Sequence, residues 1–186
     1  MTTLSASEVT ALFDEHQAKF PVLTEKIGEL KTYYNEKMWH QMTDCMVIYV
    51  KESCFDSSGN GNELIVFYEK LIQKLNFRLN PIKYAMITIQ CSRQFEAIED
   101  AIKFLESAKD RLKGHPDALF LLEISQADKK LALGQHHDCF EHLNEIKIKV
   151  NQCADVDSKV FSGLAHVYGL YYKRKDDHEN YYKACL

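Results

Sequence analysis

Apolar residues recur at helical spacing along almost the whole chain, and this recurrence leaves few folds open. Ile98, Ala101, Ile102 and Leu105 follow the spacing that puts side chains on one face of a helix. The chain of 186 residues contains only seven Gly and three Pro, fewer turn residues than an all-β protein needs. We therefore predict an all-α fold. Similar stripes lie at 64–75, 120–131, 139–150 and 160–172.

Turn residues separate the predicted helices. Asn80 and Pro81 end a helix expected over about 62–79 and suit the cap and first turn of the next. The segment 81–91, PIKYAMITIQC, is rich in β-branched residues, but no second strand lies nearby to pair with it, so we predict a helix. The loop at 53–61, SCFDSSGNG, is the one long connection.

Helix ends are marked in the same way elsewhere. Ser5 and Glu8 have the spacing of a capping box at the first helix. Gly114 and Gly134 are placed to stop helices, and Asp157 to start one. The expected connections are short, so consecutive helices should pack as hairpins.

A weak internal repeat indicates that these hairpins are stacked. Gly134 aligns with Lys175 at an offset of 41 residues. The alignment pairs His137, Asp138 and Phe140 with His178, Glu179 and Tyr181. Tetratricopeptide repeats have a period of about 34 and longer helical repeats reach the low forties. The pattern predicts a right-handed α-solenoid of the longer, tetratricopeptide-like kind, as a single domain over 1–186, with a variable helix in 1–20 and stacked hairpins over 21–186.

Composition excludes several function classes. The net charge of −4 argues against binding to nucleic-acid phosphates. The longest apolar runs are too short for a membrane span, and the N-terminus resembles no signal peptide. The cysteines form no C-x-x-C pair, which favours free thiols in a reducing, intracellular compartment. They are Cys45, Cys54, Cys91, Cys139, Cys153 and Cys185.

Catalytic and metal-binding candidates are weak. Cys139 and His142 could share one helix face and two zinc valences, with His136 and His137 beside them. The alternative, which we favour, is a small buried thiol flanked by solvated imidazoles. Nucleotide-binding and zinc-protease motifs such as G-x-x-x-x-G-K-[ST] and H-E-x-x-H do not occur in the sequence. We therefore expect no catalytic residue, no metal and no cofactor.

Three aromatic residues are the structural or interaction candidates. Trp39 lies in YYNEKMWHQMT, at the position where the predicted hairpins place an aromatic residue at the start of the second helix. We interpret it as a packing wedge between repeats, the alternative being an anchor for a partner. Tyr181 and Tyr182 lie on the last predicted helix, on a face that we expect to be partly uncovered.

Four segments carry a resemblance to a known family. They are YYNEKMWHQMTD, LIVFYEKLIQKLNFRLNP, AIKFLESAKDRLK and HENYYKACL. Their order and spacing resemble the N-terminal half of the 26S proteasome non-ATPase regulatory subunit 13 family, a lid subunit of the PCI class, over roughly residues 22–186. Members of that family are about twice this length and continue into a winged-helix module and a C-terminal helix. Neither is present here, so we expect this chain to be part of a longer protein.

The resemblance implies a function without chemistry. It implies a structural scaffold of the proteasome regulatory particle lid, in the cytoplasm and nucleus, that supports ubiquitin-dependent degradation by contacting other lid subunits and a ubiquitin-receptor subunit. Two alternatives stay open. One is a generic tetratricopeptide-type adaptor that grips an extended peptide. The other is the helical half of a PCI subunit from the signalosome or a translation initiation complex.

Overall fold

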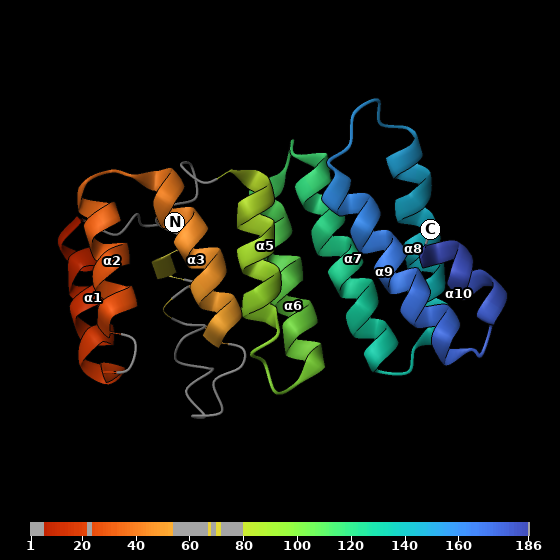
Figure 1. Cartoon of the computed structure of the whole chain (residues 1–186), viewed down its shortest axis with the longest axis horizontal. Helices are drawn as coiled ribbons and strands as arrows, with labels where there is room; N and C mark the ends of the chain where they lie inside the picture. The colour runs from red at the N-terminus through yellow and green to blue at the C-terminus, as the bar shows by residue number, and fades with distance from the viewer. Residues whose placement is uncertain (1–5, 22–23, 54–66, 68–69, 72–79, 186) are drawn as a thin grey trace. The chain divides into compact units, whose positions relative to one another are not determined.

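The structure is a computed structural model that describes residues 6–21, 24–53, 67, 70, 71 and 80–185. Every regular element in these residues is a helix, so the predicted all-α repeat fold is confirmed in this part of the chain. The chain divides into two compact units, residues 1–95 and 96–186. Each unit is considered separately below (Figure 1).

The first unit contains four described helices that pack in chain order. They are α1 (Ala6–Lys19), α2 (Thr24–Asn35), α3 (Trp39–Ser53) and α5 (Pro81–Ser92). Phe13 of α1 is fully buried and meets Tyr34 of α2, with ring centroids 5.9 Å apart. Most of the helix predicted for 62–79, the 53–61 loop beyond Ser53, and Ser5 of the predicted capping box lie outside the described residues.

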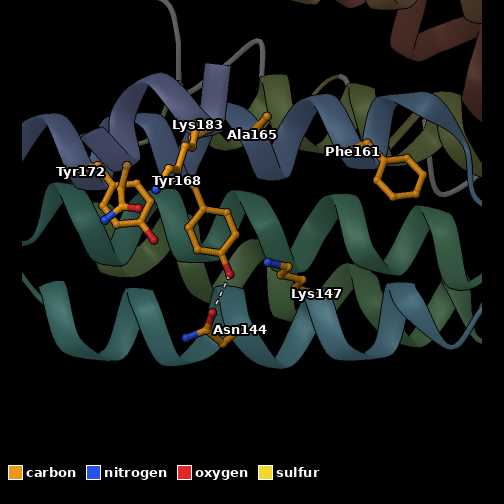
Figure 2. A pocket seen from close by; sticks show the side chains of 9 residues that line it. Asn144, Lys147, Phe161, Ala165, Tyr168, Tyr172 and Lys183 are labelled. Carbon is orange, nitrogen blue, oxygen red and sulfur yellow. Dashed lines mark hydrogen bonds between the residues drawn. The ribbon is translucent and has the colours of Figure 1, made fainter. Parts of the chain in front are cut away.

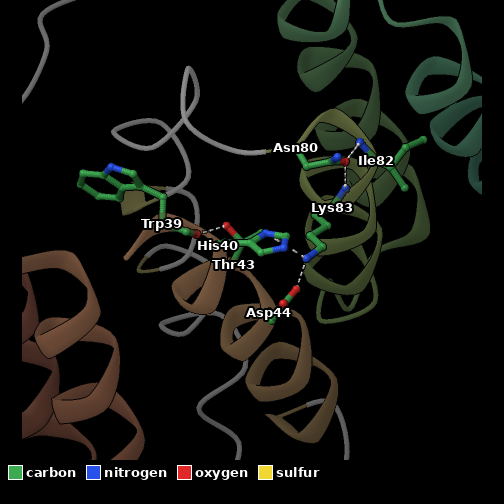
Figure 3. A network of polar contacts seen from close by, with 7 residues as sticks. All are labelled: Trp39, His40, Thr43, Asp44, Asn80, Ile82 and Lys83. Carbon is green, nitrogen blue, oxygen red and sulfur yellow. Dashed lines mark hydrogen bonds and ion pairs between the residues drawn. The ribbon is translucent and has the colours of Figure 1, made fainter. Parts of the chain in front are cut away.

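Helix α5 confirms the prediction made for segment 81–91. The Asn80 side chain accepts hydrogen bonds from the backbone N–H groups of Ile82 at 3.0 Å and Lys83 at 3.3 Å, and Pro81 occupies the first turn. Lys83 then forms an ion pair with Asp44 of α3 (Figure 3). The cap that starts α5 therefore also positions the lysine that joins α5 to α3.

A carboxylate joins α2 to α3. Glu29 accepts a hydrogen bond from Tyr33, one turn along α2, at 2.7 Å, and a second from Tyr49 of α3. The two hydrogen bonds, that of Tyr49 first, lower the pKa of Glu29. Hydrogen bonding to Glu29 raises the pKa of Tyr33 to about 12. Burial, with the Glu29 charge as a smaller cause, raises the pKa of the neighbouring Cys45 thiol.

The second unit consists of a first helix followed by two hairpins. Its elements are α6 (Ile98–Lys109), the short η2 (Asp110–Leu112), α7 (Pro116–Ala132), α8 (His136–Asn151), α9 (Ser158–Arg174) and α10 (His178–Cys185). Asp157 caps α9 as predicted, because its carboxylate accepts from Lys159 N–H at 2.8 Å.

Two polar contacts fix α9 beside α7 (Figure 1). At one end the backbone N–H of Asp157 donates to a carboxylate oxygen of Asp117 at 3.2 Å. At the other end the Arg174 guanidinium donates to the carbonyl of Leu131. The two helices therefore run parallel, start beside start and end beside end.

The repeat has a period of 42 residues, so the predicted offset of 41 is wrong. Helices α7 and α9 begin at Pro116 and Ser158, and α8 and α10 begin at His136 and His178, in both cases 42 positions apart. Gly134 has a φ of 77°, and its counterpart is Asp176 with a φ of 58°. The alignment failed because it placed Gly134 opposite Lys175, whereas Asp also tolerates the left-handed region.

One turn geometry closes three hairpins, one of them in the first unit. Lys37 adopts a φ of 60°, as Gly134 and Asp176 do in the second unit. In each turn the backbone N–H of the left-handed residue donates to the carbonyl three residues earlier. The N–H of the next residue donates to the carbonyl five residues earlier, and the two hydrogen bonds together form a Schellman motif. In this register Trp39 corresponds to His136 and His178, so the expectation of an aromatic residue shared by the hairpins at this position is wrong.

The left-handed turn predicts opposite effects for the same substitution at two glycines. Gly134→Ala should lower the free energy of unfolding by about 1 kcal/mol, because a side chain is strained at positive φ. Gly163→Ala should raise it by about 0.5 to 1 kcal/mol, since Gly163 lies inside α9 and its new Cβ would stand 3.4 Å from the Ile124 side chain, an ordinary contact. Urea unfolding followed by circular dichroism measures both. A change in the free energy of unfolding in the same direction for both variants would contradict the turn geometry.

The Glu29 contacts predict two changes on Glu29→Gln. The pKa of Glu29 is lowered in the fold, so its contribution to stability is present above the unfolded pKa and is lost as the pH falls through the folded one. As the pH is lowered, the unfolding midpoint of the variant should therefore fall less than that of the unchanged protein. The pKa of Tyr33, raised to about 12, should fall towards its ordinary value, which tyrosine titration by NMR measures. An unchanged Tyr33 titration would show that Glu29 does not hold this hydroxyl.

Candidate protein-interaction surface

Helix α9 has two apolar faces where the sequence indicated one. Val160, Leu164 and Val167 are buried, with exposed fractions of at most 6%. The neighbouring row is Phe161, Ala165, Tyr168 and Tyr172. It shares the spacing of a core face, but Phe161 is 51% exposed. Periodicity alone could not separate the two faces, because adjacent rows on a helix are offset by a single residue.

The second face forms the floor of an open groove between α8 and α10. The groove has a volume of about 500 Å³. Asn144 and Lys147 of α8 line one side, and Asn180, Lys183 and Ala184 of α10 line the other (Figure 2). The two walls are the second helices of successive hairpins, so the 42-residue repeat creates the groove.

A hydrogen bond and ring stacking hold the floor in place. The Tyr168 hydroxyl donates to the Asn144 amide oxygen at 2.8 Å (Figure 2). Burial raises the pKa of Tyr168 to about 12, so this hydroxyl stays protonated and can donate at neutral pH. Phe140 of α8 stacks on Tyr171 at a centroid distance of 4.9 Å, which joins α8 to α9 beside the groove. These contacts present a preformed aromatic surface.

The groove also has a lysine on each wall. Lys147 and Lys183 stand on opposite walls, and no carboxylate is among the described residues that line it. Lys183 forms an ion pair with Glu179 at 2.6 Å along α10, on the exposed surface. Within the described part of the chain Lys147 makes no ion pair. An apolar floor between two cationic walls is suited to a ligand that is apolar on one face and acidic at its edges.

The structure does not make Trp39 a core residue. Trp39 is half-buried at the start of α3, in edge-to-face contact with Tyr34 at 5.7 Å. Met42 and Met46, one and two turns further on, are fully buried. These two methionines are therefore fully buried residues of α3, and the wedge role of Trp39 stays a prediction. The register agrees with this order of burial: Met42 corresponds to the fully buried Cys139, whereas Trp39 corresponds to His136, which is half-buried.

Neither Trp39 nor Tyr181 is among the described residues that line the groove. Tyr181 is half-buried on α10, next to Asn180 in sequence but outside the groove lining. The side chain of Tyr182 lies outside the described residues, as does that of Cys185. Trp39 and Tyr181 belong to different units. The sequence analysis did not single out the groove residues. The signal that could have found them is the apolar row from 161 to 172 together with a lysine on each flanking helix.

The cluster of histidines around Cys139 resolves into separate environments. Cys139 is fully buried, as expected for a small core thiol, and burial raises its pKa to about 11. His137 is exposed beside Glu141, at 3.3 Å. His142 is not the solvated imidazole that we expected: it is half-buried, and burial lowers its pKa. Among the described residues no three potential ligands are grouped as a metal ion requires.

None of the helices in the described part of the chain combines the length and the apolar character of a membrane span.

The cysteines whose state the structure describes are Cys45, Cys91, Cys139 and Cys153, and each of them is a free thiol. Cys54 lies outside the described residues.

The different burial of two α3 side chains predicts an order of stability. Met42→Ala should lower the free energy of unfolding by roughly 2 to 5 kcal/mol, because it leaves a cavity in the core. Trp39→Ala should cost less than that, since the half-buried indole loses only part of its contacts. Urea unfolding of the two variants provides the comparison. A larger loss for Trp39→Ala would support the wedge interpretation.

Comparison with known proteins relates the sequence to a known family. The family model described as PSD13 N-terminal repeats matches residues 26–186. The 26S proteasome non-ATPase regulatory subunit 13 homolog A of Arabidopsis thaliana is 27% identical over 171 residues, which are 89% of this chain and 44% of that protein. The subunit 13 of Dictyostelium discoideum is 28% identical over 92% of this chain and 45% of its own length.

A fission yeast protein, the probable 26S proteasome regulatory subunit rpn9 of Schizosaccharomyces pombe, is 23% identical over 100% of this chain and 48% of its own length. The chain thus spans about half the length of the curated relatives it matches. Both units of the structure contribute to the matched region. The chain belongs to the PSD13 N-terminal repeat family, related to the N-terminal half of 26S proteasome non-ATPase regulatory subunit 13.

Proposed function

We propose that this chain is the helical-repeat part of a proteasome regulatory-particle lid subunit and acts as a scaffold without catalysis. The observation that carries the proposal is the family match over residues 26–186, in which relatives named as non-ATPase regulatory subunits cover almost the whole chain. The two units would form one helical-repeat domain that contacts neighbouring subunits. A protein with this function acts in the cytoplasm and nucleus, where proteasomes degrade ubiquitin-linked proteins.

The chemistry of the described side chains supports a scaffold. Glu29 is occupied by two tyrosine hydroxyls, and Glu106 by the Gln126 amide at 2.8 Å and by Lys109. These carboxylates have lowered pKa values because hydrogen bonds stabilise the ionised form. A general acid needs the opposite shift, a raised carboxyl pKa. The polar groups thus join helices to each other.

The partners are inferred from the relatives. We propose contacts with other lid subunits, and with a ubiquitin-receptor subunit as the finer assignment. The groove between α8 and α10 is a surface in the second unit with properties of an interface, because it combines exposed aromatic area with charge. A peptide-clamping adaptor is less well supported, since Lys147 and Lys183 lie on the second helices of their hairpins and the first helix, α9, contributes only apolar and tyrosine side chains.

Affinity purification tests the proposed function. We expect the tagged chain, expressed in cells, to enrich lid subunits over signalosome and translation initiation subunits, as measured by quantitative mass spectrometry. Leu143→Asp is the control variant, because a charge at this fully buried position should unfold the second unit and remove contacts that depend on it. Enrichment of signalosome or initiation-factor subunits would favour those alternatives. Failure to enrich any lid subunit would contradict the proposal.

A further inference from the structure

We propose that the groove between α8 and α10 receives an amphipathic helix with acidic edges from another polypeptide. This inference rests on the proposed function in one respect: we take that polypeptide to be another subunit of the regulatory particle. The groove itself is built from described residues of the second unit alone.

The floor of the groove has the spacing of a helix-packing seam. Phe161, Ala165, Tyr168 and Tyr172 follow each other in steps of four, three and four residues along α9. The row extends for about 16 Å, or three helical turns. A helix that presents apolar residues at the same spacing can pack its side chains between those of this row. An extended strand, with a side-chain period of two, has no such match.

The shape of the row also favours a helix. Ala165 is small and exposed, so it allows a partner helix to approach α9 closely at that turn. Phe161 on one side and Tyr168 on the other are large, and Tyr168 is fixed by its hydrogen bond to Asn144. The floor is therefore a shallow depression at Ala165, and Tyr168 beside it is held in place. Side chains that are already ordered lose little conformational entropy when a partner binds.

Charge identifies the chemistry of the partner. Lys147 on α8 and Lys183 on α10 stand on opposite walls: acidic residues on one edge of a bound helix would meet Lys147, which makes no ion pair within the described residues, and those on the other edge would share Lys183 with Glu179. Asn144 and Asn180 add amide groups to the same walls. A basic helix would instead place like charges against Lys147, whose charge is not compensated within the described residues, and this is destabilising. The groove thus selects an acidic helix over a basic one.

Site-specific crosslinking tests the proposal in cells. A photoreactive phenylalanine analogue at position 161 replaces an exposed aromatic side chain and should leave the fold intact. Illumination should attach it to a single segment of another chain, and mass spectrometry identifies that segment. We expect a net acidic sequence with apolar residues at steps of three and four. The same analogue at Glu145, an exposed position on α8 outside the groove, is the matched control and should not capture that segment.

Charge reversal supplies a second readout. Lys147→Glu with Lys183→Glu should reduce the crosslink yield roughly tenfold, since two weak attractions become repulsions. Lys103→Glu with Lys113→Glu makes the same change in net charge at two lysines of this unit that are 78% exposed, outside the groove, and should leave the yield unchanged. Circular dichroism of each double variant checks that the helices are retained.

The outcomes separate this inference from the proposed function. A crosslink to an acidic amphipathic helix of a protein outside the proteasome would support the groove inference and contradict the proposed function. Crosslinks to a basic or extended segment, to another part of this chain, or to a second copy of it would overturn the groove inference, whatever complex the chain enters. So would the absence of any crosslink specific to position 161.

Discussion

Burial of one face of α9 is the contact on which the second unit depends. Val160, Leu164 and Val167 are almost completely removed from water, and α9 packs against α7. Burial of such side chains stabilises a fold by about 1.5 to 3 kcal/mol each. Because this face is turned inward, the row that is offset from it by one residue must be turned towards α8 and α10. The groove is thus a geometric consequence of the core.

Polar contacts then set the alignment of the packed helices. Hydrophobic burial is not directional, so it cannot by itself determine how far α9 slides along α7. The Asp157 N–H on Asp117 and the Arg174 guanidinium on the Leu131 carbonyl hold the helices at both ends. In the first unit the Glu29 hydrogen bonds to Tyr33 and Tyr49 have the same function for α2 and α3. The lowered pKa values of Glu29 and Glu106 therefore report contacts that join neighbouring helices.

The fold was largely predictable, and the errors have identifiable causes. The helical spacing, the Asn80 cap with Pro81, and the helix stop at Gly134 all depend on interactions within a few residues, and each appears in the structure as predicted. The repeat offset was wrong by one residue because Asp176 adopts the conformation that was sought only at a glycine. That one residue changes which side chains correspond between hairpins, so that Trp39 corresponds to His136 and Met42 to the fully buried Cys139.

The sequence by itself determined the helices, their hairpin pairing and the family, because these follow from local periodicity, caps and the order of motifs along the chain. Only the tertiary structure decided which of two adjacent apolar rows on α9 became core and which became a groove floor. Both rows have the same spacing, and the choice depends on the direction from which α7 packs. The pairing of Lys147 with Lys183 across the groove is likewise tertiary, since they come from different hairpins. A sequence lists these residues, whereas their distance in space depends on how the hairpins stack.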